Sequence, residues 1–383
     1  MEDKKKAAIA NDPKKVFGRS PDQHILNVVR ESCQEAFNLP SFETTLQTIK
    51  SHFFDRNYDA VFQNPAHLPV YSARYAPSRA LCYYHLFLDH PVLMKTLEGP
   101  STILCIGSGA GSELAGISAA MVHANPVLKV KKVKKSADKE KSIKGAAKAE
   151  VQVEVQAEAG AEEMSKDTSD TKDNDTNGAA EDTTLGMEKL TVTSSEPTQE
   201  QSAEASAAAV TKTKPKKPKA NKHQVTVVMQ DYVDWSRILE PMETVIRSRM
   251  VLGPERLQCE TEIGNVLDLS DSLLERVAKA DLITFMFVLN ELFQDKKRTM
   301  LLVSKIVAAM PSGAHMLVAD SAGSFSNLKV GERTYMVYML LDHLKSLEIV
   351  YQDDATWYRC PPSLTYPLKL ENMRHFVRIY KKL

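Results

Sequence analysis

The chain has 383 residues, with 49 Lys or Arg against 49 Asp or Glu, so its formal net charge is zero. This balance argues against a uniformly basic nucleic-acid wrapper, and no apolar run approaches the ~20 residues that span a bilayer. The lysine-rich start has no apolar run behind it, which is not typical of a secretory signal. Five scattered cysteines without a C-x-x-C pair favour a reduced, intracellular protein without a structural zinc site.

The first hundred residues predict helices. Residues 1–20 are polar and lysine-rich, and we expect them to form a disordered tail. From 21 to 100, apolar residues such as Ile25 and Val29 recur at helical spacing. After a turn-rich stretch, a further amphipathic helix is expected to begin at Pro77. Residues 21–100 therefore predict an N-terminal helical layer.

Residues 101–124 change in character. The apolar run 103–106 predicts a short buried strand, and the loop Gly107-Ser108-Gly109-Ala110-Gly111 follows it directly. Apolar residues at helical spacing then begin after Ser112. A strand, a glycine loop and a helix in this order form half of a βαβ unit.

The segment 125–222 contains none of the aromatic residues of the chain and has lysine-rich ends around an acidic middle. Such a composition buries too little apolar surface to offset the entropy of ordering, so we expect a long disordered insertion of 98 residues. The lysine blocks 129–135 and 212–222 are interpreted either as nuclear-localisation or RNA-phosphate contacts or as parts of a solvated linker.

Strands and helices alternate again from residue 223. Runs of apolar and β-branched residues predict strands at 225–228, 257–263, 281–288, 313–320, 347–351 and 375–380. Helices are expected through Trp235, over 295–309 and near 334–346. With the strand at 103–106, the tally is seven strands. The chain is therefore expected to form an α/β, Rossmann-like, doubly wound sheet, with 101–124 and 223–383 as one domain.

The glycine loop indicates a cofactor site. Glycines after a strand let the backbone approach a ligand, and the following helix offers free N–H groups. In dinucleotide-type sites an acidic residue about 20 positions later binds ribose hydroxyls. Gly111 and Asp231 are 120 residues apart, and 22 remain once the 98-residue insertion is removed. The spacing therefore pairs Asp231 with the glycine loop.

The G-x-G-x-G loop, Asp231 and the paired C-terminal strands resemble the class I S-adenosylmethionine-dependent methyltransferases. The resemblance implies S-adenosyl-L-methionine as cofactor, held at the methionine end and ribose by Gly107, Gly109 and Gly111. It also implies that Asp231 binds the ribose hydroxyls and that Asn265 meets the adenine amino group. The sequence departs from the family at Cys105, where an acidic residue is common.

A closer resemblance covers the chain from about Pro21 to the C-terminus apart from the insertion. The segments Arg74 to Tyr83, Asp231 to Trp235 and Phe287 to Phe293 are similar to the fungal 25S ribosomal RNA uridine-N3 methyltransferases. The resemblance implies methylation of a uridine at N3 in ribosomal RNA or a pre-ribosomal particle, in the nucleus, nucleolus or cytoplasm. We expect a monomer without a metal or a membrane partner.

Four further residues are candidates for the chemistry. Glu291 follows the strand expected at 281–288, where the loop meets the methyl group, and is the candidate base or base-orienting acceptor. Asn290 is the candidate for holding a uracil edge. Arg74 and Arg79 are candidates for contacting RNA phosphate or the cofactor carboxylate, and ion pairs across the helical layer are the alternative for both.

Three other functions remain open. The first is a methyltransferase that acts on protein or a small molecule, with the helical layer as a closed lid. The second is an NAD-dependent oxidoreductase, against which Ser112 counts because the dinucleotide fingerprint places Gly or Ala there. The third is a non-catalytic ribosome-assembly factor, for which Cys105 is the only support. Cys360 is interpreted as structural, since N3 methylation needs no thiolate.

Overall fold

The structure is a computed structural model that describes residues 12–124, 223–323, 327–330 and 333–383, with main chain only for 327–330 and 333–335. The segment 125–222, predicted to be disordered, lies outside the described residues. Of the predicted tail 1–20, residues 12–20 are described. They include the short helix α2 (Pro13–Val16), and the ring of Phe17 is buried and stacks on His123 at 5.4 Å.

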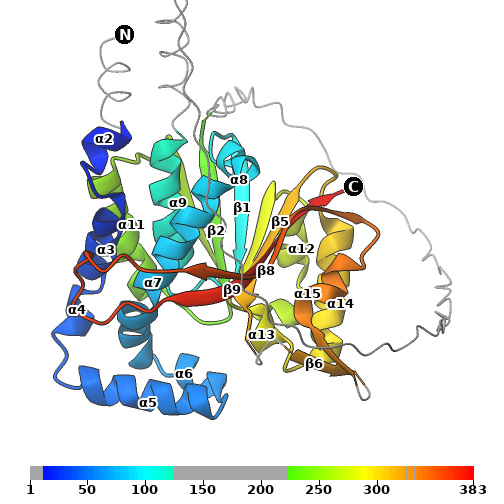
Figure 1. Cartoon of the computed structure of the whole chain (residues 1–383), viewed down its shortest axis with the longest axis horizontal. Helices are drawn as coiled ribbons and strands as arrows, with labels where there is room; N and C mark the ends of the chain where they lie inside the picture. The colour runs from blue at the N-terminus through cyan, green and yellow to red at the C-terminus, as the bar shows by residue number, and fades with distance from the viewer. Residues whose placement is uncertain (1–11, 125–222, 324–326, 331–332) are drawn as a thin grey trace, which may run out of the picture. The chain divides into compact units, whose positions relative to one another are not determined.

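Seven strands form one sheet in the order β3-β2-β1-β4-β5-β9-β8, which confirms the predicted Rossmann-like α/β fold (Figure 1). Neighbouring strands from β3 to β5 are parallel, and β9 runs antiparallel to both β5 and β8. The strands are β1 (Ser101–Ile106), β2 (Val225–Asp231), β3 (Leu257–Ile263), β4 (Leu282–Met286), β5 (His315–Ser321), β8 (Leu347–Tyr358) and β9 (Met373–Lys382). A separate hairpin pairs β6 (Asn327–Val330) with β7 (Arg333–Met336).

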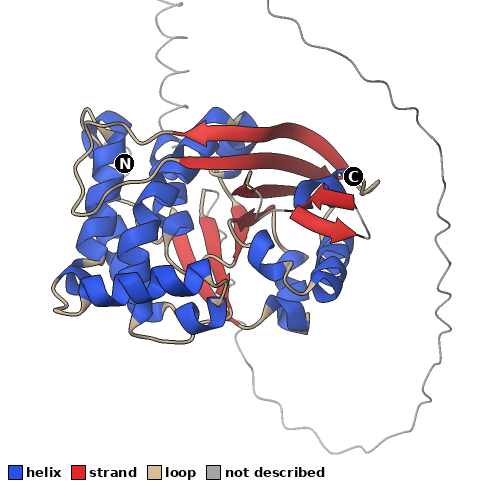
Figure 2. Cartoon of the chain, turned by 60° about the horizontal axis from the view of Figure 1, so that its bottom comes forward, coloured by secondary structure: helices blue, strands red, loops and turns tan. Residues whose placement is uncertain are grey.

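Helices cover both faces of the sheet (Figure 2). Alternate residues of β1 enter different cores: Ile103 and Cys105 pack with the N-terminal helices, and Leu104 and Ile106 pack with the C-terminal ones. This division follows from the two-residue repeat of a strand. The first layer contains α3 (Pro21–Ser32), α4 (Gln34–Phe37), α5 (Phe42–Phe54), α6 (Tyr58–Phe62), α7 (His67–Asp89), α8 (Pro91–Thr96), α9 (Ser112–His123) and α11 (Ser236–Met250). The second contains η1 (Val266–Asp268), α12 (Asp271–Val277), α13 (Leu289–Leu292), α14 (Lys296–Ala309) and α15 (Val337–Asp342).

The long helix α7 begins earlier than the sequence predicts. It starts at His67 and carries Pro77 in its interior, although Pro77 was expected to open the helix. Pro69 stands in the first turn, where an N–H has no partner within the helix, so it does not interrupt the start. The helix packs closely on α9, where a Cβ at Gly116 would lie 2.8 Å from the Ala80 carbonyl oxygen.

The C-terminal strands are longer than predicted and form a hairpin at the sheet edge (Figure 2). The buried guanidinium of Arg378 joins this hairpin to α15, because its Nε donates to Asp342 at 3.1 Å and its Nη2 donates to Asp354 at 2.6 Å. The helix expected near 334–346 is shorter, since β7 occupies its first residues.

The last residues of α9 and the first residues of β2 lie at the end of the sheet opposite Asp231. Helix α9 ends at His123, and β2 begins at Val225 at the amino end of the sheet. Both of these chain positions lie away from the carboxyl ends of β1, β2 and β4. Because ligands bind at those carboxyl ends in open α/β sheets, the site is sought there.

Candidate functional site

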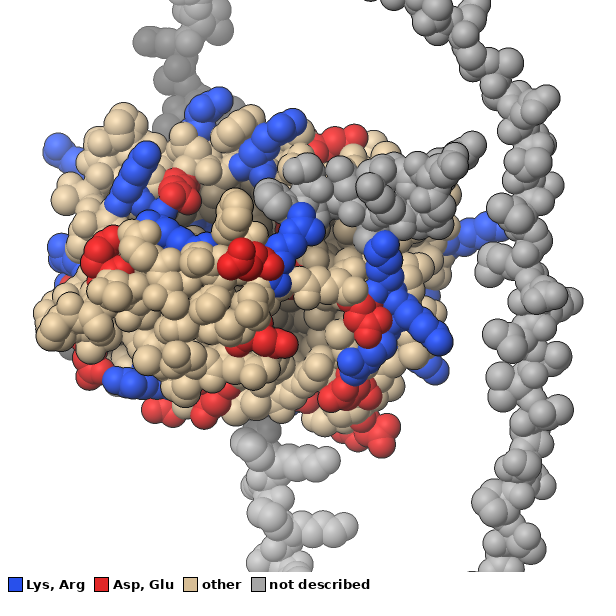
Figure 3. All heavy atoms as spheres, turned by 90° about the horizontal axis from the view of Figure 1, so that it is seen from below, with Lys and Arg blue, Asp and Glu red and all other residues tan. Residues whose placement is uncertain are grey.

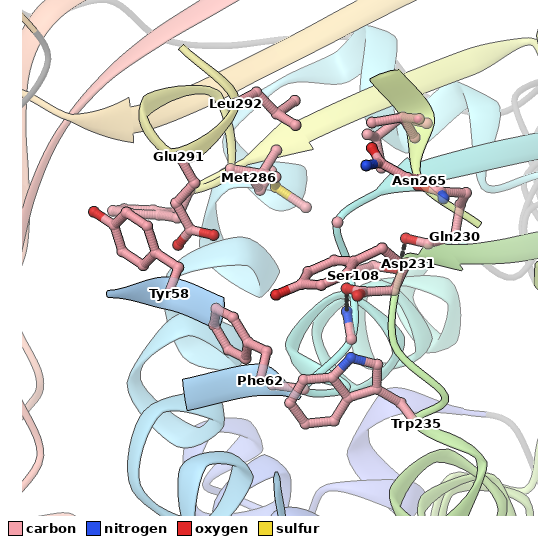
Figure 4. Close-up of a pocket in the computed structure, with 18 of the residues that line it drawn as sticks. Tyr58, Phe62, Ser108, Gln230, Asp231, Trp235, Asn265, Met286, Glu291 and Leu292 are labelled. Atoms are coloured by element: carbon pink, nitrogen blue, oxygen red, sulfur yellow. Dashed lines mark hydrogen bonds between the residues drawn. The ribbon is translucent and has the colours of Figure 1, made fainter. Parts of the chain in front are cut away.

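A cavity of about 410 Å³ lies at the carboxyl ends of β1, β2 and β4 (Figure 4). The order of the sheet reverses between β1 and β4, which is the point at which such sheets bind ligands. The lining comes from α6, α7, the glycine loop, the start of α9 and the ends of β2, β3 and β4. Segments that are distant in sequence therefore converge on one cavity.

The glycine loop needs its glycines. Gly107 and Gly111 have φ of 65° and 83°, values that other residues rarely adopt. A Cβ at Gly107 would lie 2.4 Å from Val288, and one at Gly109 would lie 2.0 Å from Trp235 Nε1. Gly107 and Gly109 line the cavity, whereas Gly111 caps α9 and packs on α11 instead.

Asp231, the last residue of β2, is tied to the glycine loop. Its Oδ2 accepts the Gly109 N–H at 3.0 Å, and its Oδ1 accepts the Val233 N–H at 3.1 Å. Burial raises the pKa of Asp231, and these amide donors oppose that effect by stabilising the carboxylate. The pairing predicted from the spacing therefore brings a carboxylate acceptor to the glycine loop.

Asn265 lines the same cavity from the turn after β3. Its Oδ1 accepts the Leu267 N–H at 3.0 Å and so shapes the turn that leads into η1. Nearby, the Gln230 side-chain amide donates to the Gly264 carbonyl at 2.6 Å and joins the ends of β2 and β3. Asn265 therefore combines a turn role with a position from which it faces a ligand.

The two predicted arginines are placed differently. Arg79 lines the cavity, donates to the Tyr71 hydroxyl at 2.8 Å and lies over the ring of Phe287 at 5.4 Å. Arg74 is not among the lining residues, and it pairs with Glu371 and donates to the Lys369 carbonyl at 3.1 Å. The structure thus brings Arg79 to the site, and for Arg74 it shows the ion pair that was the alternative.

The charge of Arg79 is well supported. Burial alone lowers its pKa, but the fields of Tyr71, Tyr83 and Glu291 outweigh this and hold the pKa above its usual value. Phe287, beneath the guanidinium, has a φ of 60°. A positive φ is unfavourable for an aromatic residue and is tolerated only where the surroundings hold it. A strained backbone position thus lies directly beside Arg79.

Glu291 lines the cavity and Asn290 does not. Burial raises the pKa of Glu291 to about 8, although Arg79 lowers it. Asn290 lies behind it, where its backbone N–H donates to Asp320 Oδ2 at 3.1 Å and its Nδ2 donates to Asp320 Oδ1 at 2.5 Å. Asp320 thus positions the turn that carries Glu291, and the role of Asn290 at a uracil edge stays a prediction.

Several cavity residues were not predicted. Glu113, in the first turn of α9, is only 3% exposed, and burial raises its pKa to about 8. Tyr58 and Phe62 come from α6 and lie near Trp235 in the cavity (Figure 4). The buried indole of Trp235 lies where a Cβ on Gly109 would be. The position of Glu113 in the helical turn directly after the glycine loop was the only local signal, because burial depends on tertiary packing.

The cavity favours a cation. Its ionisable lining residues with acidic or basic side chains are Arg79 against five carboxyl groups, from Asp59, Glu113, Asp231, Glu291 and Asp295. A pyrophosphate would meet this acidic lining unfavourably, which counts against a dinucleotide. A ligand with a ribose, an amino acid and a positive charge suits Asp231, the glycine loop and this excess of carboxyl groups. S-adenosylmethionine has all three features.

The fold and site define a class I, Rossmann-like methyltransferase domain. A family model described as "Putative SAM-dependent methyltransferase" matches residues 29–381. The chain therefore belongs to this family of S-adenosylmethionine-dependent methyltransferases, and S-adenosylmethionine is its cofactor. When bound, this cofactor supplies an electrophilic methyl group.

Individual relatives were also found. The 25S rRNA (uridine(2843)-N(3))-methyltransferase of Saccharomyces cerevisiae is 25% identical over 362 residues, covering 88% of this chain and 77% of the yeast protein. TehB from Haemophilus influenzae is 13% identical with a TM-score of 0.26, over 42% of this chain and 50% of that chain. A SAM-dependent methyltransferase from Methanosarcina mazei is 16% identical with a TM-score of 0.28, over 42% and 82% respectively. These TM-scores are low, so the fold assignment rests on the strand order.

Two kinds of feature are absent from the described residues. No cluster of His, Cys, Asp or Glu there has a geometry that would hold a metal ion. No helix in the same part of the chain has the length and apolar character needed to cross a membrane.

Proposed function

We propose that this methyltransferase transfers a methyl group to N3 of a uridine in large-subunit ribosomal RNA, as free RNA or within a pre-ribosomal particle. The similarity to the yeast enzyme over 88% of the chain is the observation that carries the proposal. The same proposal places the protein in the nucleus, nucleolus or cytoplasm. Its acting as a monomer stays a prediction.

The site offers the groups that this reaction needs. Asp231 and the glycine loop would hold the ribose and the methionine end, with Asn265 at the adenine and Arg79 at the cofactor carboxylate. These placements fix the methyl group, and holding the reacting atoms in line supplies much of the rate advantage. Contact of Arg74 with RNA stays a prediction, because its side chain is 9% exposed and pairs with Glu371.

Glu291 is proposed as the proton acceptor. Uridine N3 carries a proton at neutral pH, so its lone pair reaches the methyl group only as that proton leaves. Glu291 faces the cavity from the turn after β4, beside Tyr58 from α6 (Figure 4). A positioned base contributes about 10²- to 10⁴-fold to such a transfer. Asn290 supports this role by fixing the turn through Asp320.

The surface around the cavity has a mixed charge, which suits an RNA contact that does not rest on charge alone. Figure 3 shows it from below, with basic and acidic side chains interspersed and a hollow among them. A face of this kind does not bind every nucleic acid through charge alone, because non-specific binding needs many uncompensated phosphate contacts. Selectivity would then depend on the cavity and on RNA shape.

Primer extension tests the proposal. N3 methylation blocks Watson–Crick pairing and leaves a reverse-transcription stop, so ribosomal RNA from a strain that lacks the gene should lose one stop. The purified protein with S-adenosylmethionine should restore that stop. If the deletion strain keeps every stop, the RNA assignment is refuted. Methylation of protein or a small molecule in a cell extract would then support the alternative substrate.

Substitution of Glu291 tests the proton acceptor. Glu291→Gln keeps the shape of the side chain and removes the base, so transfer should fall by about 10²- to 10⁴-fold. Affinity for S-adenosylhomocysteine, measured by calorimetry, should change little and shows that the cavity is intact. Full transfer by Glu291→Gln with unchanged cofactor affinity would remove the proposed role.

A further inference from the structure

The charges around Glu291 are unbalanced. The titratable groups that face it come from several elements: Tyr58 from α6, Tyr71 and Arg79 from α7, Asp231 and Tyr232 at the end of β2, and Asp320 at the end of β5. Arg56, after α5, acts on Tyr58. Arg79 is the one Lys or Arg in the described lining, and it also lowers the pKa of Glu113 by its charge. One guanidinium thus faces more carboxyl groups than it neutralises.

A cavity lined by this many carboxyl groups favours their protonated forms. Burial raises the pKa values of both Glu291 and Glu113 to about 8, and Arg79 only partly offsets the effect. At pH 7 a carboxyl group of that pKa is roughly nine-tenths protonated. Without a ligand, Glu291 is therefore mostly a neutral acid, which is the wrong state for a base.

The cofactor and its product differ by one charge next to this group. S-adenosylmethionine has a positive sulfonium, and S-adenosylhomocysteine has a neutral thioether, while the amino-acid and nucleoside parts are the same. A unit charge about 6 Å from a carboxyl group, in an effective dielectric constant of about 20, changes its ionisation equilibrium by about a hundredfold. That change is sufficient to convert a mostly protonated carboxyl group into a mostly ionised one at pH 7.

We propose that Glu291 loses its proton when S-adenosylmethionine binds and keeps it when S-adenosylhomocysteine binds, so that the cavity becomes basic only when the methyl donor is present. The inference rests on the position of Glu291 near the transferred methyl group, which is part of the proposed function. It does not depend on which RNA, or which other acceptor, is methylated.

The proton balance of the transfer follows. The N3–CH₃ bond forms as the S–CH₃ bond breaks, and the sulfur retains the bonding electron pair as a neutral thioether. The N3 proton passes to the Glu291 carboxylate. Glu291 is then neutral beside a neutral sulfur, and this is also its protonation state in the ligand-free cavity. The net charge of the site does not change during the step.

Calorimetry without RNA tests this proposal. Binding enthalpies of both ligands are measured at pH 7.0 in two buffers of different ionisation enthalpy, and their difference gives the number of protons released. S-adenosylmethionine should release about 0.8 proton more than S-adenosylhomocysteine. At this pH the α-amino groups of both ligands are mostly protonated, and the same measurement on Glu291→Gln reports what they contribute to the difference. From pH 6.5 to 7.5, affinity for S-adenosylmethionine should rise about sixfold relative to the product.

Two matched variants assign the proton. Glu291→Gln should abolish the difference between the ligands. Glu113→Gln removes the other lining carboxyl group whose pKa is raised to about 8, and the difference should persist there; loss of the difference in Glu113→Gln, rather than in Glu291→Gln, would assign the proton to Glu113 and overturn the proposal. Equal proton release by the two ligands in the wild-type protein overturns the proposal, as does a difference that survives Glu291→Gln. Because RNA is absent, failure of the RNA assignment leaves this result unaffected.

Discussion

The glycine loop gives the sharpest test of the site. A Cβ at position 109 would lie 2.0 Å from Nε1, 2.2 Å from Cε2 and 2.6 Å from Cδ1 of Trp235. Ordinary carbon contacts need about 3.5 Å, so in Gly109→Ala the indole must retreat by more than about 1 Å. Trp235 is 4% exposed and packs near the rings of Phe62 and Tyr71 at 6.2 and 5.8 Å, which leaves it little room.

The magnitude follows from this packing. Overpacking of a filled core costs about 1–3 kcal/mol. Because the cofactor needs the loop in its native position, with the Gly109 N–H on Asp231, we expect the cost to appear in cofactor binding. Calorimetry with S-adenosylmethionine should show an affinity about 5- to 150-fold weaker. Gly264→Ala, at a lining glycine where a Cβ would meet no protein atom within 4 Å, measures what a methyl group in the cavity costs when Trp235 is not displaced.

A second substitution identifies the cause. Trp235→Leu removes the indole atoms that the new methyl group would strike, so Gly109→Ala should cost less in that background. The coupling free energy of the double-mutant cycle should be about 1 kcal/mol or more. Wild-type affinity in Gly109→Ala, or additive effects in the cycle, would refute the reasoning.

Three further outcomes are expected. Between pH 4.5 and about pH 8, Glu113 is protonated in the folded protein and ionised in the unfolded chain. The free energy of unfolding therefore falls as pH rises through that window. Glu113→Gln should therefore lessen the decline in denaturant titrations, by up to about 1.4 kcal/mol per pH unit. Arg79→Met should weaken cofactor binding about 10- to 100-fold in calorimetry, whereas Arg74→Met should leave it unchanged because Arg74 pairs with Glu371. Asp231→Asn should weaken it at least about tenfold, and an unchanged Kd would exclude Asp231 from the ribose site.

The local part of the site was predictable from the sequence. A strand, a glycine loop and a helix follow one another directly, so Gly107 and Gly109 could be recognised from their spacing alone. Asp231 required one further step, which was to notice that a segment without aromatic residues separates the first helix from the second strand. Both inferences depend on short-range geometry that the chain must adopt wherever it folds in this way.

The remaining part depends on tertiary contacts. Arg74 and Arg79 stand five residues apart, so on a helix of 3.6 residues per turn they point about 140° away from each other. Both had been proposed for one task, and the structure brings only Arg79 to the cavity. The start of α7 was missed because Pro77 resembles a helix opening. In the structure the helix continues through Pro77, and the Ala73 carbonyl that lacks its N–H accepts from the Tyr366 hydroxyl at 2.9 Å, a contact between distant segments.

Cys105 stands where the methyltransferase family often has an acidic residue, and Glu113 supplies a carboxyl group to the cavity from another element. Cys105 is fully buried in β1 and does not line the cavity, so a carboxyl group is indeed absent from the strand end. Glu113 projects into the same cavity from the first turn of α9, close enough to raise the pKa of the Cys105 thiol further above the value that burial sets. The site therefore keeps an acidic group beside the glycine loop, supplied by the helix rather than the strand. A helix-borne carboxyl group near Arg79 preserves the acidic lining that suits a sulfonium, so Cys105 is no argument for a non-catalytic protein.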